Sequence, residues 1–360
     1  MSKTILVTGA AGFIGSNFVE IALSHGYSVV GYDLLTYAGH LENIEAFQKN
    51  PKFKFVRADI LDSDFFLNTL KENQVSWVAH FAAESHVDKS ISGPKAFVET
   101  NVNGTYSLLN ASREYFETLK GKERSDFRFL HVSTDEVFGT LGPTGKFTET
   151  TPYQPNSPYS ASKAASDLLV RAWFHTYGLP TIITNCSNNY GPHQFPEKLI
   201  PHMILCALQG KALPVYGKGE NIRDWIQVKD HARGVLLALE KGEPGETYCF
   251  GGNSERTNLD VVNSLCKILD ELKPLESGKR YRELISFVAD RPGHDFRYAI
   301  DDTKAQKKLG FRRGFTQFED GLRDAVQWYL SNLEWVKRVT SKPGVKVSYD
   351  WSLLSQKGPK

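Results

Sequence analysis

The sequence predicts an α/β fold in which a doubly wound parallel sheet is joined to a smaller C-terminal α/β lobe. In the first half of the 360 residues, short β-branched and apolar runs alternate with segments of helical periodicity, a pattern typical of parallel β-α-β units. A glycine-rich turn follows the first run, and the alternation becomes irregular after Gly178. We therefore expect a large domain over residues 1–187, a smaller lobe over 188–340 with a possible return of the chain to the first domain, and a polar tail over 341–360.

The individual elements follow from local patterns. Runs rich in β-branched and aromatic side chains predict strands at residues 4–8, 27–32, 53–57, 75–81 and 127–132. Apolar residues at helical spacing predict helices at 13–25 and 64–72, and two long ones at 94–116 and 160–177. A stretch rich in Gly, Pro and Thr predicts an ordered loop or lid at 139–158. Beyond it, the expected elements are strands at 181–185 and 247–250 and helices at 199–208, 229–240 and 259–272.

Composition excludes several classes of protein. Lys and Arg number 43 against 41 for Asp and Glu, so the net charge of +2 offers no basic excess for nucleic acid. No apolar run reaches the roughly 18–20 residues that span a bilayer, and the N-terminus is typical of a strand entering a turn rather than of a secretory signal. The four cysteines form no CxxC pair. We therefore expect no metal site, and reduced thiols in a cytoplasmic protein.

The glycine-rich turn has the spacing of a dinucleotide-binding loop. Gly9, Gly12 and Gly15 stand between the first strand and the first helix, where glycines permit a tight turn and close approach of backbone to a pyrophosphate. Asp33 ends the second strand, where a carboxylate accepts hydrogen bonds from the adenosine ribose and repels a 2′-phosphate, which favours NAD over NADP. Asp59, after the third strand, is a candidate partner of the adenine amino group. The alternative for both aspartates is that they cap neighbouring turns.

Tyr159 and Lys163 are the candidates for hydride chemistry. They stand four residues apart at the start of a predicted helix, so both side chains lie on one face. A nearby ammonium favours the phenolate, and we expect the pKa of Tyr159 to fall towards neutrality. Such a tyrosine can take a proton from a sugar hydroxyl while hydride leaves the same carbon, and Lys163 can also reach the nicotinamide ribose.

Three motifs together resemble the extended short-chain dehydrogenase/reductase family. They are the run TGAAGFIG at residues 8–15, the strand end Ser133-Thr134 and the run YSASK at residues 159–163. Members of this family have a Rossmann domain that holds NAD tightly, and many act on nucleotide sugars. Further runs resemble its nucleotide-sugar dehydratases from residue 3 to about 335, among them FAAESHVD at 81–88, NCSNNYGP at 185–192 and DRPGHD at 290–295. The implied second lobe binds the nucleotide sugar, and the implied sugar is dTDP-glucose.

Adjacent carboxylates select the reaction. Asp135 and Glu136 follow the strand at 127–132, and carboxyl ends of parallel strands face the ligand crevice. Their mutual repulsion can hold one of them protonated, which places an acid beside a base. Oxidation of a hexose at C4 acidifies the C5 proton, so a base can remove that proton while an acid expels the C6 hydroxyl as water. A 4,6-dehydratase needs this extra pair and an epimerase does not; the alternative is a pair of solvated loop charges.

The resemblance also implies residue roles. Tyr159 starts C4 oxidation with Lys163 and Thr134, Glu136 removes the C5 proton, and Asp135 protonates the leaving hydroxyl. The implied cofactor contacts are Gly9, Gly12, Phe13, Ile14, Gly15, Asp33, Thr36, Asp59, Ile60, Ala82, Ala83, Thr100, Tyr159, Lys163 and Asn189. The implied substrate contacts are Ser85, Asn188, Lys198, Leu199, Pro214, Tyr216, Arg223, Asn258, Arg291 and His294. Independently, a bidentate guanidinium suits a diphosphate, which favours Arg223 and Arg291 as its contacts; the alternative for each is a surface ion pair.

Partners and rival functions complete the expectations. In this family the two long helices pair into a four-helix dimer interface, which implies a homodimer. Their apolar residues can instead be plain core; these are Val98, Leu108, Leu109, Leu168, Leu169 and Trp173. A UDP-sugar dehydratase or epimerase is the nearest rival, since a thymine methyl changes binding by only about 1–3 kcal/mol. A non-catalytic NAD-binding scaffold is the second.

Overall fold

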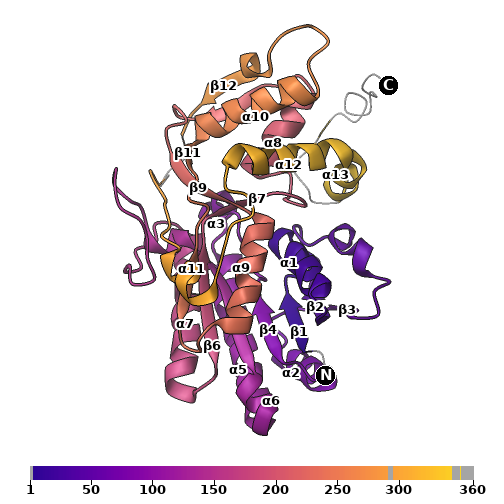
Figure 1. Cartoon of the computed structure of the whole chain (residues 1–360), viewed down its shortest axis with the longest axis vertical. Coiled ribbons are helices and arrows are strands. Elements are labelled where there is room, and N and C mark those ends of the chain that lie inside the picture. Colours follow the sequence, from indigo (N-terminus) through magenta and orange to yellow (C-terminus); the bar gives the residue numbers. More distant parts are fainter. Residues whose placement is uncertain (1–2, 291–294, 343–348, 350–360) are drawn as a thin grey trace.

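The computed structural model describes residues 3–290, 295–342 and 349, and it confirms the α/β fold class (Figure 1). Its main sheet contains seven strands in the order β10-β6-β5-β4-β1-β2-β3, and every neighbouring pair is parallel. The strands are β1 (Thr4–Thr8), β2 (Ser28–Asp33), β3 (Phe53–Arg57), β4 (Trp77–His80), β5 (Arg128–Thr134), β6 (Thr181–Cys186) and β10 (Thr247–Phe250). Strand order reverses beside β1, so the crevice of a doubly wound sheet opens between the carboxyl ends of β1 and β4.

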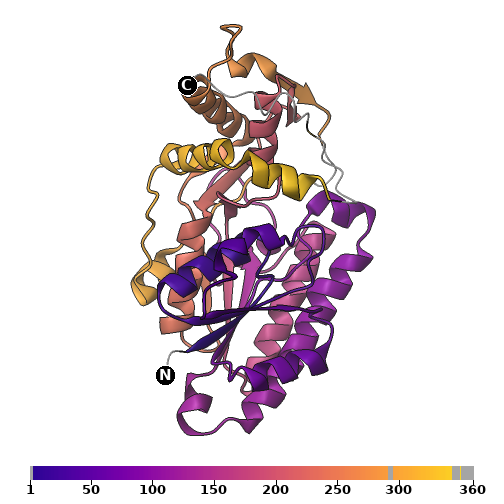
Figure 2. The ribbon, with the colours of Figure 1, turned by 90° about the vertical axis from the view of Figure 1, so that its right-hand side faces the viewer.

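Helices cover both faces of this sheet. One face is packed by α1 (Phe13–Ser24), α9 (Val228–Lys241) and α11 (Thr303–Leu309). The other face is packed by α2 (Ser63–Glu72), α5 (Thr105–Thr118) and α7 (Pro158–Tyr177). Figure 2 shows the two long helices α5 and α7 side by side. The near-continuous apolar strands follow from this burial, because a parallel sheet covered on both faces leaves no strand a polar side.

The helix predicted at 94–116 is interrupted. It consists of α4 (Lys95–Phe97), a π-helical stretch η3 (Val98–Gly104) and α5. A Cβ on Gly104 would lie 2.5 Å from Cδ1 of Ile60, so any larger residue would require the Ile60 side chain, in the loop after β3, to move. The other long helix, α7, begins at Pro158 behind a Ser157 capping box and ends at Gly178 in the left-handed conformation. The π stretch widens the helix beside the crevice, where such insertions often serve a site.

One strand from the second half of the chain joins the main sheet. β10 pairs with β6, and α9, which precedes it, packs against α1. The chain therefore returns to the first sheet after it has entered the other lobe. Division of the chain into domains at residues 187 and 188 stays a prediction.

The smaller lobe lies above the carboxyl ends of the strands (Figures 1 and 2). It holds a sheet of β11 (Glu255–Thr257), β9 (Ile222–Gln227) and β7 (Asn188–Tyr190), and a parallel pair of β12 (Ile285–Val288) and β8 (Leu213–Tyr216). Its helices α8 (Leu199–Leu208), α10 (Asn258–Leu272), α12 (Phe318–Ser331) and α13 (Leu333–Thr340) share one apolar core. The short elements elsewhere are η1 (Leu41–Asn43), η2 (Glu45–Phe47), α3 (Val87–Ser92), α6 (Gly121–Asp126), η4 (Asp135–Phe138) and η5 (Tyr281–Leu284).

The Gly-rich loop at 139–158 is tied to the chain near residue 300. Phe147 forms an isolated bridge with Ile300, and Arg297 donates to the carbonyls of Gly142 and Gly145.

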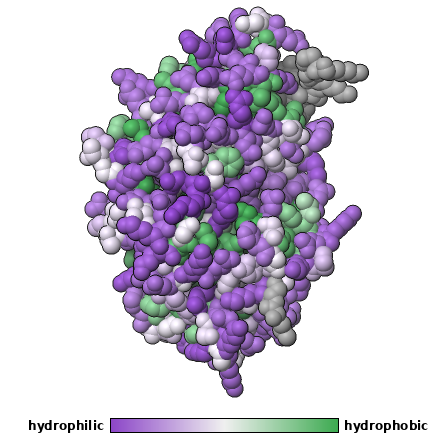
Figure 3. Space-filling view, viewed as in Figure 1, coloured by the Kyte–Doolittle hydropathy of each residue, from purple (hydrophilic) through white to green (hydrophobic). Residues whose placement is uncertain are grey.

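Hydrophilic residues dominate the face shown in Figure 3, with apolar groups scattered between them. Within the described residues, every helix is too short or too polar to cross a membrane.

Candidate active site

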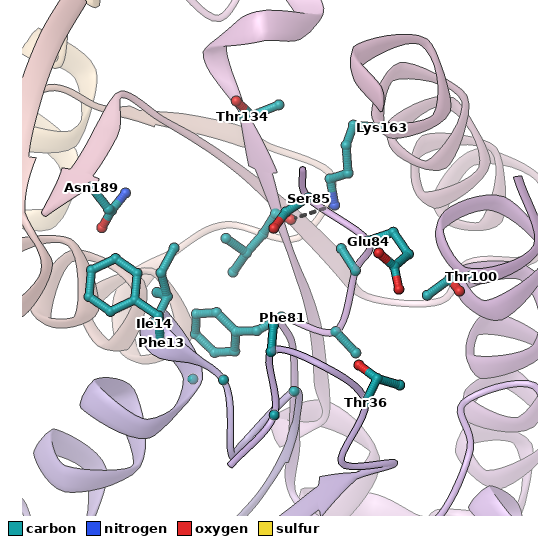
Figure 4. A pocket seen from close by; sticks show the side chains of 18 of the residues that line it. Phe13, Ile14, Thr36, Phe81, Glu84, Ser85, Thr100, Thr134, Lys163 and Asn189 are labelled. Atoms are coloured by element: carbon teal, nitrogen blue, oxygen red, sulfur yellow. Dashed lines mark hydrogen bonds between the residues drawn. The ribbon is translucent and has the colours of Figure 1, made fainter. Parts of the chain in front are cut away.

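A cavity of about 370 Å³ lies at the reversal of strand order, between the main sheet and the smaller lobe. Its walls come from the glycine loop, the carboxyl ends of β2, β4 and β5, the start of α7 and the segment 186–198. Figure 4 shows Phe13 and Ile14 across this cavity from Lys163 and Thr134. Every predicted catalytic residue and every predicted cofactor contact lines it.

The glycine loop leaves no room for side chains. Gly9 has a φ of +68°, and a Cβ there would lie 2.8 Å from the backbone nitrogen of Ala82. A Cβ on Gly15 would collide with the carbonyl oxygen of Gly9. Gly12 is the N-cap of α1 and supplies no side-chain acceptor to the first turn. The backbone N–H groups of that turn therefore have no side-chain cap at the positive end of the helix dipole, and the turn lines the cavity.

Both aspartates predicted to hold the adenosine line the cavity and also cap turns. Asp33 accepts the N–H of Ala11 at 3.0 Å and that of Leu35 at 2.8 Å, and it is buried. Asp59 accepts the N–H of Leu61 at 3.0 Å. Burial raises the pKa of Asp33 despite these two bonds. The two readings of each aspartate are therefore compatible, because a carboxylate has enough lone pairs for both.

These residues fit a dinucleotide. A glycine cradle that any Cβ would fill lies under an uncapped helix N-terminus, which suits a pyrophosphate. The carboxylate of Asp33 lies at the end of the adjacent strand, at the ribose position of the doubly wound fold. Ile60 and Ala82 add apolar wall on the same side of the cavity.

The expected depression of the Tyr159 pKa is wrong for this structure. Burial, and next the charge of Glu136, raise the pKa of Tyr159 well above its usual value, while a hydrogen bond with Thr134 opposes them. The ammonium of Lys163 donates to the carbonyl of Val132 at 2.8 Å and lies 3.2 Å from Nε2 of His131. Burial lowers the pKa of Lys163 to about 8. Burial and the charge of Glu136 therefore outweigh the effect that the spacing of Tyr159 and Lys163 implied.

The adjacent carboxylates differ in environment. Asp135 is 2% exposed, and burial followed by the charges of Glu136 and Asp224 raises its pKa well above the usual value. Glu136 is partly exposed and faces the cavity. Burial rather than mutual repulsion is the larger cause of the difference. A neutral acid therefore stands beside a second carboxyl group, which is the arrangement that elimination of water requires.

Buried amides hold the loops around these groups. Asn101, in the π stretch, exchanges hydrogen bonds with the backbone of Glu84 and donates to Ser162 Oγ at 2.9 Å. Asn185 donates to the carbonyl of Thr134 at 3.0 Å. Neither amide was identified from the sequence, since a buried asparagine has no motif of its own. Asn101 therefore ties the loop after β4 to α7, and Asn185 ties the end of β5 to β6.

The predicted substrate contacts divide into three groups. Ser85, Asn188 and Lys198 line the cavity, and Lys198 donates to the carbonyl of Ser85 at 3.2 Å. Arg291 and His294 lie outside the described residues. The remaining five lie in the smaller lobe but not in the cavity wall: Leu199, Pro214, Tyr216, Arg223 and Asn258.

The guanidinium of Arg223 is already engaged. It donates to the carbonyls of Ile222 and Asp295 at 2.8 and 2.9 Å and lies over the ring of Tyr298. Its role towards a diphosphate stays a prediction.

Several cavity residues escaped the sequence analysis. Cys186 ends β6 in the wall of the cavity, and burial raises the pKa of its thiol. Glu84 and Glu197 also line it, and Glu197 pairs with Lys89 at 3.0 Å. Residues 84 and 186 stand within runs that resemble the family, at 81–88 and 185–192, and this position was the available signal.

Comparisons of the sequence with known proteins agree with this site. Residues 6–325 match the family model described as GDP-mannose 4,6 dehydratase. The dTDP-glucose 4,6-dehydratase of Xanthomonas campestris pv. campestris is 57% identical over 336 residues, which cover 93% of this chain and 95% of the relative. An Escherichia coli dTDP-glucose 4,6-dehydratase is 54% identical over 347 residues, which cover 94% and 95%.

Solved structures agree in fold. The dTDP-glucose 4,6-dehydratase of Bacillus anthracis in complex with NAD has a TM-score of 0.83 and 44% identity, over 94% of this chain and 100% of that chain. The Streptomyces venezuelae enzyme with NAD and TYD bound has a TM-score of 0.84 and 43% identity, over 93% and 99%. A Thermotoga maritima UDP-glucose 4-epimerase has a TM-score of 0.80 at 28% identity, over 92% and 99%.

Fold and cavity define a short-chain dehydrogenase/reductase of the extended type, because a glycine loop, a Tyr-Lys pair and a second lobe surround one crevice. The chain belongs to the GDP-mannose 4,6 dehydratase family, whose model it matches over 6–325.

Proposed function

We propose that this chain catalyses the NAD-dependent 4,6-dehydration of dTDP-glucose to dTDP-4-keto-6-deoxyglucose. The observation that carries the proposal is one cavity that holds the glycine loop, Tyr159 and the pair Asp135 and Glu136. The 57% identical relative named for this activity supports the same substrate.

The proposed roles follow from position and charge. The chemistry that bound NAD supplies is reversible hydride transfer, and its oxidised ring adds positive charge that favours a phenolate. Tyr159, hydrogen-bonded to Thr134, takes the proton of the C4 hydroxyl. Glu136 takes the C5 proton, and Asp135, kept neutral by burial, gives its proton to the leaving C6 hydroxyl. Lys163, Asp33 and the glycine loop hold the cofactor, and Ser85, Asn188 and Lys198 hold the nucleotide sugar.

An epimerase is the rival on the same fold, as the Thermotoga relative illustrates. The pair Asp135 and Glu136 favours dehydration, because inversion at C4 requires no acid at C6. The choice between dTDP-glucose and UDP-glucose rests on the relatives. The test is to incubate the purified protein with each sugar and identify the products by mass. Loss of one water from the dTDP sugar without net NAD consumption is expected; C4 epimerisation or no reaction would refute the proposal. Tyr159→Phe is the inactive control.

A homodimer through the two long helices is also proposed. Val98 and Leu168 are 50% and 58% exposed, as are Tyr106 and Tyr177 at 46% each. Leu108, Leu109 and Trp173 are instead buried within the subunit, so only part of the expected apolar set is available to a partner. These exposed side chains stand on η3, α5 and α7, and large exposed apolar groups mark interfaces when they cluster.

The dimer is tested by light scattering during size-exclusion chromatography. Leu168→Glu should convert a dimer into a monomer, because it places a charge in the proposed interface. Phe287→Glu is the matched control, since Phe287 is 59% exposed but lies on β12 in the smaller lobe. A monomeric wild-type protein would contradict the proposal.

We also place the protein in the reducing cytoplasm. The four cysteines are free and buried, which suits a compartment that keeps thiols reduced. Cell fractionation with a peptide antibody tests this location.

A further inference from the structure

The ammonium of Lys163 contacts a buried polar cluster whose other members have no role in the proposed reaction. Lys163 is 4% exposed, and its Nζ lies 2.8 Å from the carbonyl oxygen of Val132 and 3.2 Å from Nε2 of His131. Both contacts are neutral acceptors. An ammonium in such surroundings loses its proton readily unless a negative charge lies close by.

Asp167 supplies that charge from the next turn of α7. Its Oδ1 lies 3.2 Å from the same Nε2 of His131, and Ser133 donates to its Oδ2 at 2.8 Å. The side chains of His131 and Asp167 are both 0% exposed. Burial raises the pKa of Asp167 to about 6, and the charge of Lys163 opposes that rise. Burial lowers the pKa of Lys163 to about 8, and the charge of Asp167 opposes that fall. The two side chains therefore lie beside the same Nε2 of one neutral imidazole, which accepts from Lys163 and then has no proton to donate to Asp167, so the carboxylate acts on the ammonium through its charge.

The other titratable groups around Lys163 carry no compensating charge. His80 and His131 have pKa values lowered by burial, so both rings are neutral. His80 is held by hydroxyl partners, Thr8 at 2.7 Å and Thr105 at 3.0 Å. Burial raises the pKa values of Cys186 and Tyr159, so both are neutral at pH 7 until the charge of bound cofactor favours the phenolate of Tyr159. Tyr153 also hydrogen-bonds to Asp167, and burial raises its pKa, so it is neutral at that pH.

We propose that Asp167 is a positioning residue for the hydride step, and that its buried carboxylate is the counter-charge that keeps Lys163 protonated in the cavity wall. The inference rests on the proposed function and deepens it. Lys163 lines the cavity and Asp167 lies behind it, so the carboxylate acts on the lysine through its charge. Ser133, at the end of β5, aims the carboxylate.

A consequence is an alkaline limit to the reaction. The pKa of Lys163 is lowered from 10.5 to about 8, so its positive charge is present below that pH and is lost as pH rises through it. An opposite charge close to an ionisable group changes the pKa of that group by about 1–3, so removal of the Asp167 carboxylate should lower the pKa of Lys163 by a similar amount. In Asp167→Asn the lysine should therefore become neutral at a lower pH, and the rate of C4 oxidation should begin to fall at a correspondingly lower pH.

The first measurement does not depend on activity. Competitive acetylation of the whole enzyme, followed by peptide mass spectrometry, gives the pH at which Lys163 becomes a reactive amine. We expect a midpoint near pH 8 in the wild type and a midpoint about one or more pH units lower in Asp167→Asn. Ser166→Ala is the matched control, because Ser166 is buried on the same helix but bonds to the carbonyls of Asn101 and Ser162. An unchanged midpoint in Asp167→Asn overturns the proposal.

The second measurement is the rate of nicotinamide reduction in a Glu136→Gln background, where the reaction stops after C4 oxidation. Asp167→Asn should slow this rate at least tenfold at pH 8 and shift its alkaline limb to lower pH, with the KM for the sugar nearly unchanged. If the alkaline limb of the pH–rate profile lies at the same pH with and without the Asp167→Asn change, the proposal is overturned. If the Glu136→Gln variant reduces no cofactor but the acetylation midpoint of Lys163 still falls in Asp167→Asn, the proposed function has failed and the role of Asp167 stands.

A pair of longer side chains covers the case of a misfolded Asn variant. Asp167→Glu and Asp167→Gln add the same methylene and differ only in charge. The glutamate variant should keep a higher acetylation midpoint than the glutamine variant. Equal midpoints in this pair would equally refute the counter-charge.

Discussion

Gly15→Ala is the sharpest test of the glycine cradle. The added Cβ would collide with the carbonyl oxygen of Gly9 and lie 2.8 Å from its carbonyl carbon and 3.2 Å from Cα of Ala10. All three atoms belong to backbone, so no side chain can rotate away. The loop itself must move from α1, and with it the N–H groups that face the cavity.

The magnitude follows from that overlap. Forcing a methyl group into packed structure costs about 1–3 kcal/mol. If cofactor binding must restore the loop, the same energy is lost from binding, and the Kd for NAD rises roughly 5- to 150-fold. Isothermal titration of cofactor-stripped protein with NAD measures this change.

The control is Gly93→Ala, where the nearest atom to the new Cβ is the Lys89 carbonyl oxygen at 3.7 Å. That variant should bind NAD like the wild type. A Kd for Gly15→Ala within twofold of the wild-type value would refute the reasoning, since it would mean that the loop yields without cost or does not hold the cofactor.

Three further predictions concern other groups. In Glu136→Gln, exchange of the C5 proton with solvent deuterium should collapse while C4 oxidation survives; unchanged exchange by mass spectrometry removes Glu136 from the base role. Asn101→Ala breaks two bonds to Glu84, at 2.8 and 3.0 Å, and should lower the free energy of unfolding in urea by about 1–3 kcal/mol; a loss below half of that contradicts the role. Trp335→Phe removes a 2.8 Å bond to Asn43, which itself holds the Ala11 carbonyl, and should weaken NAD binding severalfold by titration; wild-type affinity counts against this support.

Local pattern was enough for much of the fold. The strand ranges at 4–8 and 53–57 agree with β1 and β3 to the residue, because short β-branched runs between turn residues leave few alternatives. The strand at 247–250 was also expected, but not its partner. Its position beside β6 depends on a chain return across the molecule, and sequence pattern carries no record of which strands pair.

The interruption of the long helix at Val98–Gly104 was not foreseen. Apolar periodicity there fits a plain α-helix equally well, so local pattern gives no sign of the π-helical stretch. The stretch lies where Gly104 packs against Ile60, a residue 44 positions away, and such contacts are not visible in local pattern.

The sequence by itself determined the chemistry that this protein can offer: a glycine loop, a Tyr-Lys pair and two adjacent carboxyl groups stand at spacings that its backbone converts into one crevice. Only the tertiary structure decided the charge states. Burial raises the pKa values of Tyr159 and Asp135 and lowers that of Lys163, and it places Asp167 against His131. The physical reason is that desolvation depends on everything packed around a group, whereas spacing along the chain reports only its nearest neighbours.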